Sequence, residues 1–343
     1  MKIFSGSSNK PLAEKIATLL KKRLGRVEIN IFADGEKRIR VTDRIVGKDC
    51  TVLQSTSTDV DKNYMELFFI ADAFKRNGAR AITAVIPYLG YQRQDHMFRV
   101  GEAVSLDVIV KMLEGVGIDK IVAVDLHSIK IPELFHIGFV HLSALPIFAE
   151  KIKEISIARR GPATTFPPAS APLTSSKMRA VGNPSSRVTP RLDLSDVVLV
   201  SPDMGGIRRI KILSKMLGNM PYAAVVKNRD VKTGKITVSN IEGKLKKNAI
   251  IVDDMISTGR TIVLASELLR RKGVEEIFVF ATHPVFSQDC PKALQQAFIE
   301  KVFVTDTIEV SKEKQFPKLE VLSVAEVIAK SIQNAKVKIQ NYK

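Results

Sequence analysis

Residues 249–261 read Ala-Ile-Ile-Val-Asp-Asp-Met-Ile-Ser-Thr-Gly-Arg-Thr. The apolar run predicts a buried strand that ends in two acids, after which a short polar loop opens a helix. In open α/β sheets, ligands bind outside the carboxyl ends of the strands, and the N–H groups of a helix start bind phosphate. Gly259 lets a ligand approach the backbone, and Ser257, Thr258 and Thr261 add hydroxyl donors. The segment therefore predicts a phosphate-binding loop.

Asp253 and Asp254 need a different role, because carboxylates do not bind phosphate directly. Two sugar hydroxyls would satisfy them as donors, and a magnesium ion could bridge to one of them. A single Asp here would be explained by the helix macrodipole alone. The pair combined with the loop instead favours a sugar phosphate as ligand. This segment resembles the phosphoribosyl-diphosphate loop of the type I phosphoribosyltransferase fold, which many different reactions share.

Short apolar runs alternate with amphipathic stretches along the chain, which predicts parallel sheets covered by helices on both faces. The pattern restarts after residue 195, so we expect an α/β protein with two similar domains. The expected division is 1–150, a linker over 151–195, and 196–343, with the last helix packing back on the first domain. The expected strands are 2–4, 28–32, 51–54, 81–86, 120–124, 197–200, 223–226, 249–252 and 277–281. The expected helices are 11–24, 64–77, 104–115, 207–217, 261–272, 290–298 and 324–334.

The linker contains a basic segment, residues 159–191, with six arginines and lysines, no acid and six of the chain's fifteen prolines. It shows no apolar period, so we expect a disordered insertion. The net charge of +17 predicts attraction to polyanions. Trp is absent and no aromatic residues alternate with the basic run, which favours small anionic ligands over nucleic acid.

The number of cysteines and the length of the apolar runs argue against a disulfide-rich secreted protein and against a membrane-spanning protein. Two cysteines, Cys50 and Cys290, cannot form a disulfide framework, which indicates a reducing cytoplasm. No apolar run approaches the length of about 18 residues that a membrane span needs, and no signal peptide is expected.

Polar residues follow several of the other predicted strands. His127 follows the strand at 120–124, and Asp203 precedes the pair Gly205-Gly206. Residues 91–96 read Tyr-Gln-Arg-Gln-Asp-His, where Arg93 offers a fork for phosphate oxygens. Residues 32–36 read Phe-Ala-Asp-Gly-Glu, where an aromatic face and two carboxylates suit a purine. Read alone, the last two segments are also explained as a polar loop and a β-turn.

The order of these motifs resembles that of the ribose-phosphate diphosphokinases, over nearly the whole chain except 159–191 and the C-terminal end. The resemblance implies two phosphoribosyltransferase-like domains with an active site between them. It implies that adenine is read by Phe32, Asp34 and Glu36 from a neighbouring subunit, and that ATP contacts Arg93, Gln94, Asp95 and His96. It implies magnesium at His127 and Asp203, catalysis by Lys227 and Arg229 beside a mobile loop, and ribose 5-phosphate at Asp253, Asp254, Ser257, Thr258, Gly259 and Thr261.

The implied reaction moves the diphosphoryl group of ATP to ribose 5-phosphate, with Mg²⁺ as cofactor and a homo-oligomer as the working form. A phosphoribosyltransferase is an alternative, but it would need neither the 91–96 motif nor a second domain. A non-catalytic regulatory paralogue is another, although such a chain should have lost catalytic positions that are present here. Residues 96–105 and Ser257 depart from the commonest family pattern.

Overall fold

The computed structural model describes residues 1–157, 192–229 and 236–334. Its N-terminal half is built on five parallel strands in the order β1-β4-β5-β6-β7. These strands are β1 (Lys2–Ser5), β4 (Asp49–Leu53), β5 (Ala81–Ile86), β6 (Lys120–Val124) and β7 (Gly138–Leu142). The helices of this half are α1 (Lys10–Leu19), α2 (Val60–Arg76), α3 (Ser105–Gly115), α4 (Leu145–Ile157) and the 3₁₀ turn η1 (Ile131–Leu134). The inner strands β4, β5 and β6 are mostly buried apolar runs, as parallel sheets require, whereas the edge strand β7 is only half-buried.

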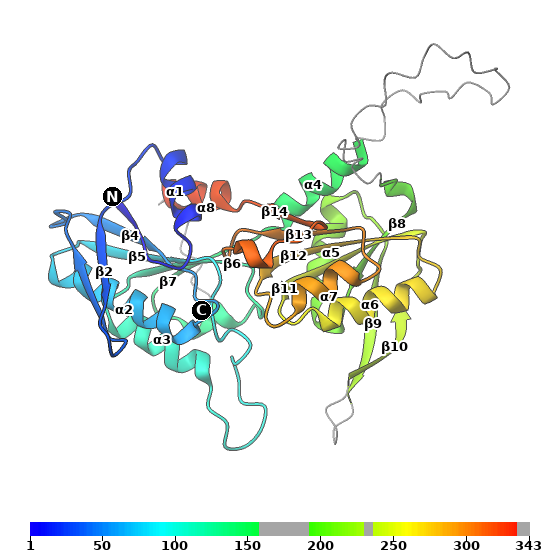
Figure 1. Cartoon of the computed structure of the whole chain (residues 1–343), viewed down its shortest axis with the longest axis horizontal. Helices are drawn as coiled ribbons and strands as arrows, with labels where there is room; N and C mark the ends of the chain where they lie inside the picture. The colour runs from blue at the N-terminus through cyan, green and yellow to red at the C-terminus, as the bar shows by residue number, and fades with distance from the viewer. Residues whose placement is uncertain (158–191, 230–235, 335–343) are drawn as a thin grey trace, which may run out of the picture.

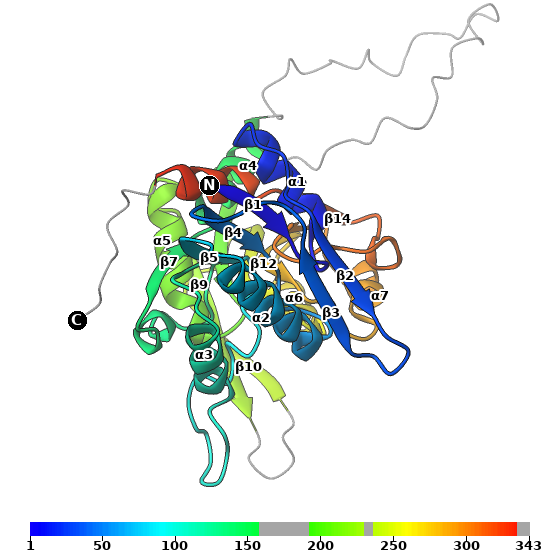
Figure 2. The same cartoon turned by 90° about the vertical axis from the view of Figure 1, so that its left-hand side faces the viewer.

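An antiparallel hairpin stands beside this sheet as a separate two-stranded sheet. It consists of β2 (Val27–Ile31) and β3 (Lys37–Val41), and Ile31 is paired with Lys37 next to the tip. Figure 1 shows it on the side of the N-terminal domain that faces away from the second sheet, and Figure 2 shows it projecting from the body.

The second half contains seven strands in the order β10-β9-β8-β11-β12-β13-β14, of which only β10 is antiparallel to its neighbour. They are β8 (Val197–Ser201), β9 (Tyr222–Arg229), β10 (Ile236–Glu242), β11 (Asn248–Ile256), β12 (Glu276–Pro284), β13 (Lys301–Thr305) and β14 (Leu319–Leu322). The helices are α5 (Ile207–Met216), α6 (Arg260–Arg271), α7 (Cys290–Gln296) and α8 (Ala325–Gln333). Short 3₁₀ turns are η2 (Leu194–Asp196), η3 (Met204–Gly206) and η4 (Lys312–Lys314).

A single apolar core joins the two halves. It contains Leu12 of α1, Phe148 of α4, Phe280 of β12 and Ile328 of α8, all fully buried. Figure 1 shows α8 beside α1, so the last helix packs against the first. Separate cores fill the other face of each sheet. Because apolar side chains of both domains are buried in this one core, the core fixes how the carboxyl ends of the two sheets lie relative to each other.

The structure confirms two α/β domains with helix-covered parallel sheets, and it corrects several element predictions. The helix expected over 11–24 ends at Leu19, because Lys21 adopts a left-handed conformation (φ 52°) that breaks it. The hairpin strand β3 was not predicted, since charged residues occupy its outer face. The elements β7, α4, β10, β13 and β14 were not predicted either.

Two further expectations, the disordered insertion and the domain boundaries, concern a region that the structure covers incompletely. The basic segment 159–191 lies outside the described residues, and α4 continues past residue 150. The division into 1–150, 151–195 and 196–343 therefore stays a prediction. Among the helices of the described ranges, none has the length and apolar character needed to cross a bilayer.

Candidate active site

Strand β11 carries the two acids beyond the end of its neighbour β8. It pairs with β8 only as far as Ile251, but with β12 as far as Ile256. The strand was expected to end before Asp253; instead it continues through both acids, because β12 supplies backbone partners there. Asp253 and Asp254 therefore lie on a rigid extended segment at the carboxyl edge of the sheet, with side chains 15% and 7% exposed.

His127 reaches these acids from the other domain. Its Nδ1 lies 2.6 Å from Oδ2 of Asp254, and its backbone N–H donates to Oε1 of Gln92 at 2.9 Å. His127 lies in the loop after β6, so this contact joins the carboxyl ends of the two sheets. The side chain remains 46% exposed and can meet a ligand. Because Nδ1 is engaged with Asp254, that ligand would meet Nε2.

Arg209 of α5 lies against both acids, with its Nη1 3.7 Å from Oδ1 of Asp254 and 4.0 Å from Oδ1 of Asp253. Burial would raise the pKa of Asp254, but the hydrogen bond from His127 and the charge of Arg209 outweigh it and lower that pKa. The same hydrogen bond raises the pKa of His127 against the effect of burial. Burial and the adjacent Asp254 raise the pKa of Asp253 well above its usual range.

This division of charge leaves Asp254 as a firmly ionised acceptor. Asp253 carries an energetic cost when ionised, which a bound donor or cation would relieve. Asp203, the N-cap of η3, adds to that cost by its own charge. Its Oδ1 accepts a hydrogen bond from the N–H of Gly206 at 3.3 Å. The carboxylates therefore form a cluster suited to several hydrogen-bond donors.

The loop after β11 ends at Gly259, the N-cap of α6, which has φ 75°. A Cβ at this position would lie 2.9 Å from Sγ of Cys290, so only glycine fits without movement. The first N–H groups of a helix have no partner within it and attract anions. Ser257 is held by a hydrogen bond between its Oγ and that of Ser287 (3.0 Å), while Thr258 is exposed and Thr261 is half-buried.

A cavity of about 1020 Å³ opens where the two domains meet. Its lining includes Arg93, Asp95 and His96 from the loop after β5, and Arg208 and Arg209 of α5. The lining also includes His127, whereas Gln94 does not contribute among the described residues. Nδ1 of His96 lies 2.6 Å from Oδ1 of Asp95, so these two side chains are paired with each other. The concentration of cationic side chains suits a polyanionic ligand.

The residues predicted to read a purine lie elsewhere. Phe32, Asp34 and Glu36 form the tip of the hairpin, where all three are exposed, and none of them lines the cavity of the same chain. The turn is closed by hydrogen bonds from the Phe32 N–H to the Glu36 carbonyl (2.8 Å) and from the Gly35 N–H back to the Phe32 carbonyl (2.9 Å).

Lys227 and Arg229 lie on β9, where their backbones pair with Val238 and Ile236 of β10. Their side chains, and the stretch 230–235 expected to be mobile, lie outside what the structure describes.

Sequence reasoning missed two features of the site. One is Arg209, for which the available signal was an arginine pair just after Gly205-Gly206. The other is a second link between the domains at Asp125. Its Oδ2 accepts from Thr282 Oγ1 (2.7 Å) and from the Ala144 N–H (3.0 Å), and its carbonyl lies 3.0 Å from Nε2 of His283. The Asp125 backbone is left-handed (φ 35°). The residue directly follows the predicted strand at 120–124, but nothing in the local sequence indicates its contacts with the second domain.

The side chains of the site offer few ligands to a metal ion. Within residues 1–157, 192–229 and 236–334, no three His, Cys, Asp or Glu side chains converge to hold one. Mg²⁺, however, keeps several waters and takes one or two protein ligands together with substrate phosphates. A magnesium ion that arrives with a polyphosphate would find a suitable oxygen ligand in the carboxylate of Asp203, while a magnesium contact of His127, whose Nδ1 is paired with Asp254, stays a prediction.

Comparisons with known proteins agree with this architecture. Residues 1–117 match the model of the N-terminal domain of ribose phosphate pyrophosphokinase, and residues 215–340 match the phosphoribosyl synthetase-associated domain. A ribose-phosphate pyrophosphokinase of Gloeobacter violaceus is 34% identical over 97% of this chain and 89% of its own length. Ribose-phosphate pyrophosphokinase 1 of Streptococcus pyogenes serotype M3 is 35% identical over 97% and 93%. The crystal structure of phosphoribosylpyrophosphate synthetase from Mycobacterium smegmatis superposes with a TM-score of 0.81, at 31% identity over 97% of both chains.

Proposed function

The chain belongs to the ribose-phosphate pyrophosphokinase family, and we propose that it transfers the diphosphoryl group of ATP to the anomeric hydroxyl of ribose 5-phosphate. The observation that carries this proposal is the hydrogen bond between His127 and Asp254. It joins the loop that suits a sugar phosphate to the cationic cavity that suits a triphosphate. A phosphoribosyltransferase of one domain would need no such junction.

Ribose 5-phosphate binds along residues 253–261 in this proposal. The helix start at Gly259 and the hydroxyls of Ser257, Thr258 and Thr261 receive its phosphate, while the carboxylates of Asp253 and Asp254 accept hydrogen bonds from two ring hydroxyls. Two sugar donors would offset the burial and the repulsion from Asp254 that together raise the pKa of Asp253.

ATP occupies the cavity, with its phosphates toward Arg93 and Arg209 and with Asp95 and His96 positioning the nucleotide. A contact of ATP with Gln94, which does not line this cavity, rests on the family resemblance alone. Asp203 and His127 would hold a magnesium ion in this proposal, and the ion would supply charge neutralisation for the polyphosphate. The exposed hairpin tip lies outside the cavity of its own chain. We therefore assign adenine contact to Phe32, Asp34 and Glu36 of a second copy, which makes the working form a homo-oligomer.

The reaction is an in-line displacement at the β-phosphorus. The C1 oxygen of ribose forms a bond to this phosphorus and gives its proton to solvent. The bond from the phosphorus to the α,β-bridging oxygen breaks, and AMP leaves with that electron pair. Such transfers depend on positioning and charge neutralisation. Lys227 and Arg229, on the strand that leads into residues 230–235, stabilise the negative charge that develops.

The test uses the purified full chain with ATP, Mg²⁺ and ribose 5-phosphate, followed by chromatography of nucleotides. AMP and 5-phosphoribosyl 1-diphosphate should form in equal amounts, and ribose lacking the phosphate serves as the control. AMP that does not depend on ribose 5-phosphate, or no AMP above background, would refute the proposal. Mass photometry of the same sample tests the shared adenine site, since a chain that is entirely monomeric should be nearly inactive.

A further inference from the structure

Lys37 occupies an unusual position at the base of the hairpin tip. Strand β3 alternates, with Lys37, Ile39 and Val41 half-buried and Arg38 and Arg40 exposed. An ammonium group therefore stands on the inward face, where lysine is rare unless it is paired. Its side chain is only 13% exposed. It directly follows Glu36 in the chain, so any constraint on Lys37 acts on the tip itself.

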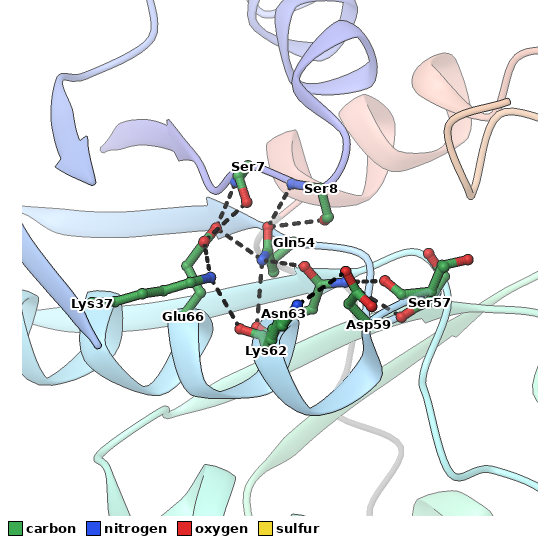
Figure 3. Close-up of polar contacts among 10 residues, drawn as sticks. Ser7, Ser8, Lys37, Gln54, Ser57, Asp59, Lys62, Asn63 and Glu66 are labelled. Atoms are coloured by element: carbon green, nitrogen blue, oxygen red, sulfur yellow. Dashed lines mark hydrogen bonds and ion pairs between the residues drawn. The ribbon is translucent and has the colours of Figure 1, made fainter. Parts of the chain in front are cut away.

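The partner of Lys37 is Glu66 of α2. The Nζ atom lies 2.6 Å from Oε2 of Glu66, whose side chain is 1% exposed, and 3.3 Å from the carbonyl oxygen of Lys62 (Figure 3). Burial raises the pKa of Glu66, but hydrogen bonds from Lys37 and Ser7 outweigh it and lower that pKa. Glu66 is therefore an ionised acceptor, and Lys37 balances its charge.

Glu66 is also held by hydrogen bonds from residues other than Lys37. It accepts hydrogen bonds from the N–H of Ser7 (2.6 Å), from Oγ of Ser7 (2.9 Å) and from Nε2 of Gln54 (3.0 Å). Oε1 of Gln54 in turn accepts from the N–H and Oγ of Ser8 (Figure 3). A Cβ on Gly6 would lie 2.2 Å from this Oε1, so the loop after β1 is packed directly on the network. The carboxylate that accepts from Lys37 is thus held in place by the loops that follow β1 and β4 of the N-terminal sheet.

The rest of the hairpin has few constraints near its tip. Its strands pair only with each other, and an isolated two-stranded hairpin is marginally stable in water. Val27 and Val41 pack on the N-terminal core at the far end from the tip, and Ile39 does so at the middle of β3. The last paired residues are Ile31 and Lys37, and Ile31 is exposed. The Lys37–Glu66 pair is therefore the attachment closest to Phe32, Asp34 and Glu36.

We propose that the Lys37–Glu66 ion pair is a positioning element that holds the hairpin tip in the orientation needed to receive adenine. This inference rests on the proposed function, in which the tip contacts ATP bound by a second copy. Lys37 touches no substrate and is a positioning residue. Without the pair, the tip would adopt several orientations, and ATP affinity would fall by the fraction of time spent in the competent one.

The test compares Lys37→Met with Arg40→Met, which removes a charge from the exposed face of the same strand. Lys37→Met should raise the KM for ATP about 5- to 20-fold, as expected if the competent orientation becomes a minor one. The kcat and the KM for ribose 5-phosphate should stay within twofold, and Arg40→Met should match the wild type. The double variant Lys37→Met/Glu66→Gln, which leaves no unpaired buried carboxylate, should show the same selective rise.

Hydrogen exchange of the backbone amides of residues 31–37 provides a second readout, which should be faster in Lys37→Met. An unchanged KM for ATP, or equal losses toward both substrates, would overturn the inference. A wild-type chain that forms no AMP would instead refute the proposed function. The exchange measurement would then test by itself whether the Lys37–Glu66 pair holds the hairpin tip, and unchanged exchange in Lys37→Met would overturn that role.

Discussion

Replacing Asp254 by Asn tests the centre of the site with almost no change in shape. The carboxylate receives two cationic groups, with His127 at 2.6 Å on Oδ2 and Arg209 at 3.7 Å on Oδ1. Asparagine has one acceptor oxygen and one NH₂ donor, so it can satisfy only one of the two. Loss of a charge-assisted hydrogen bond in a buried site typically costs about 1.5–3 kcal/mol. That range corresponds to a fall of roughly 10- to 150-fold in kcat/KM for ribose 5-phosphate.

Stability should change much less than activity in Asp254→Asn. The variant loses contacts to His127 and Arg209, but it also removes the repulsion from Asp254 that, after burial, raises the pKa of Asp253. We expect the free energy of unfolding to fall by no more than about 1–2 kcal/mol, which is a shift of a few degrees in Tm for a chain of this size.

The assay measures AMP formation at varied ribose 5-phosphate and thermal unfolding of the same samples. Asp107→Asn, at an exposed position on α3 paired with Lys111, is the matched control and should behave as the wild type. A kcat/KM within threefold of the wild type in Asp254→Asn would refute the assigned role. A large drop in Tm that accounts for the lost activity would show that Asp254 acts only in folding.

Three further outcomes are expected. Lys227→Ala or Arg229→Ala should lower kcat on the order of 10²–10³-fold with little change in the KM for ribose 5-phosphate, and near-normal turnover would contradict their catalytic role. Asp253→Asn should stabilise the ligand-free protein by on the order of 1 kcal/mol at pH 8 but not at pH 4.5. The raised pKa of Asp253 means that the wild type loses stability as this group ionises, and an equal Tm difference at both pH values would exclude that cause. The stabilisation from Glu66, whose pKa is lowered, is complete above its ordinary value of 4.5 and is lost as the pH falls through the lower folded value. Wild-type unfolding should therefore depend more steeply on pH below 4.5 than unfolding of Glu66→Gln, and equal slopes would argue against an ionised Glu66.

Local patterns were enough to predict most of the framework. The strand at 81–86 and the strand at 120–124 were predicted with the bounds that the structure shows, because apolar runs bounded by polar turns are set by nearby residues. The loop at 253–261 was predicted for the same reason: an apolar strand, a glycine with positive φ and a helix start all lie within thirteen residues. The error at Asp253 arose because the length of β11 depends on β12, which supplies its partners more than twenty residues later.

The sequence alone determined the alternation of strands and helices and the family, and it predicted the phosphate loop, since each depends on residues close together along the chain. Only the tertiary structure decided which of these segments meet. His127 and Asp254 are 127 positions apart, and Lys37 and Glu66 come from different elements. Whether such pairs form depends on strand order and on the core shared by α1, α4, α5 and α8, and no local period encodes either. For this reason the contacts of Arg209 follow only from the packing of α5 against β11, and those of Asp125 only from the packing of the two domains. The Lys37–Glu66 pair likewise follows only from the packing of the hairpin on α2.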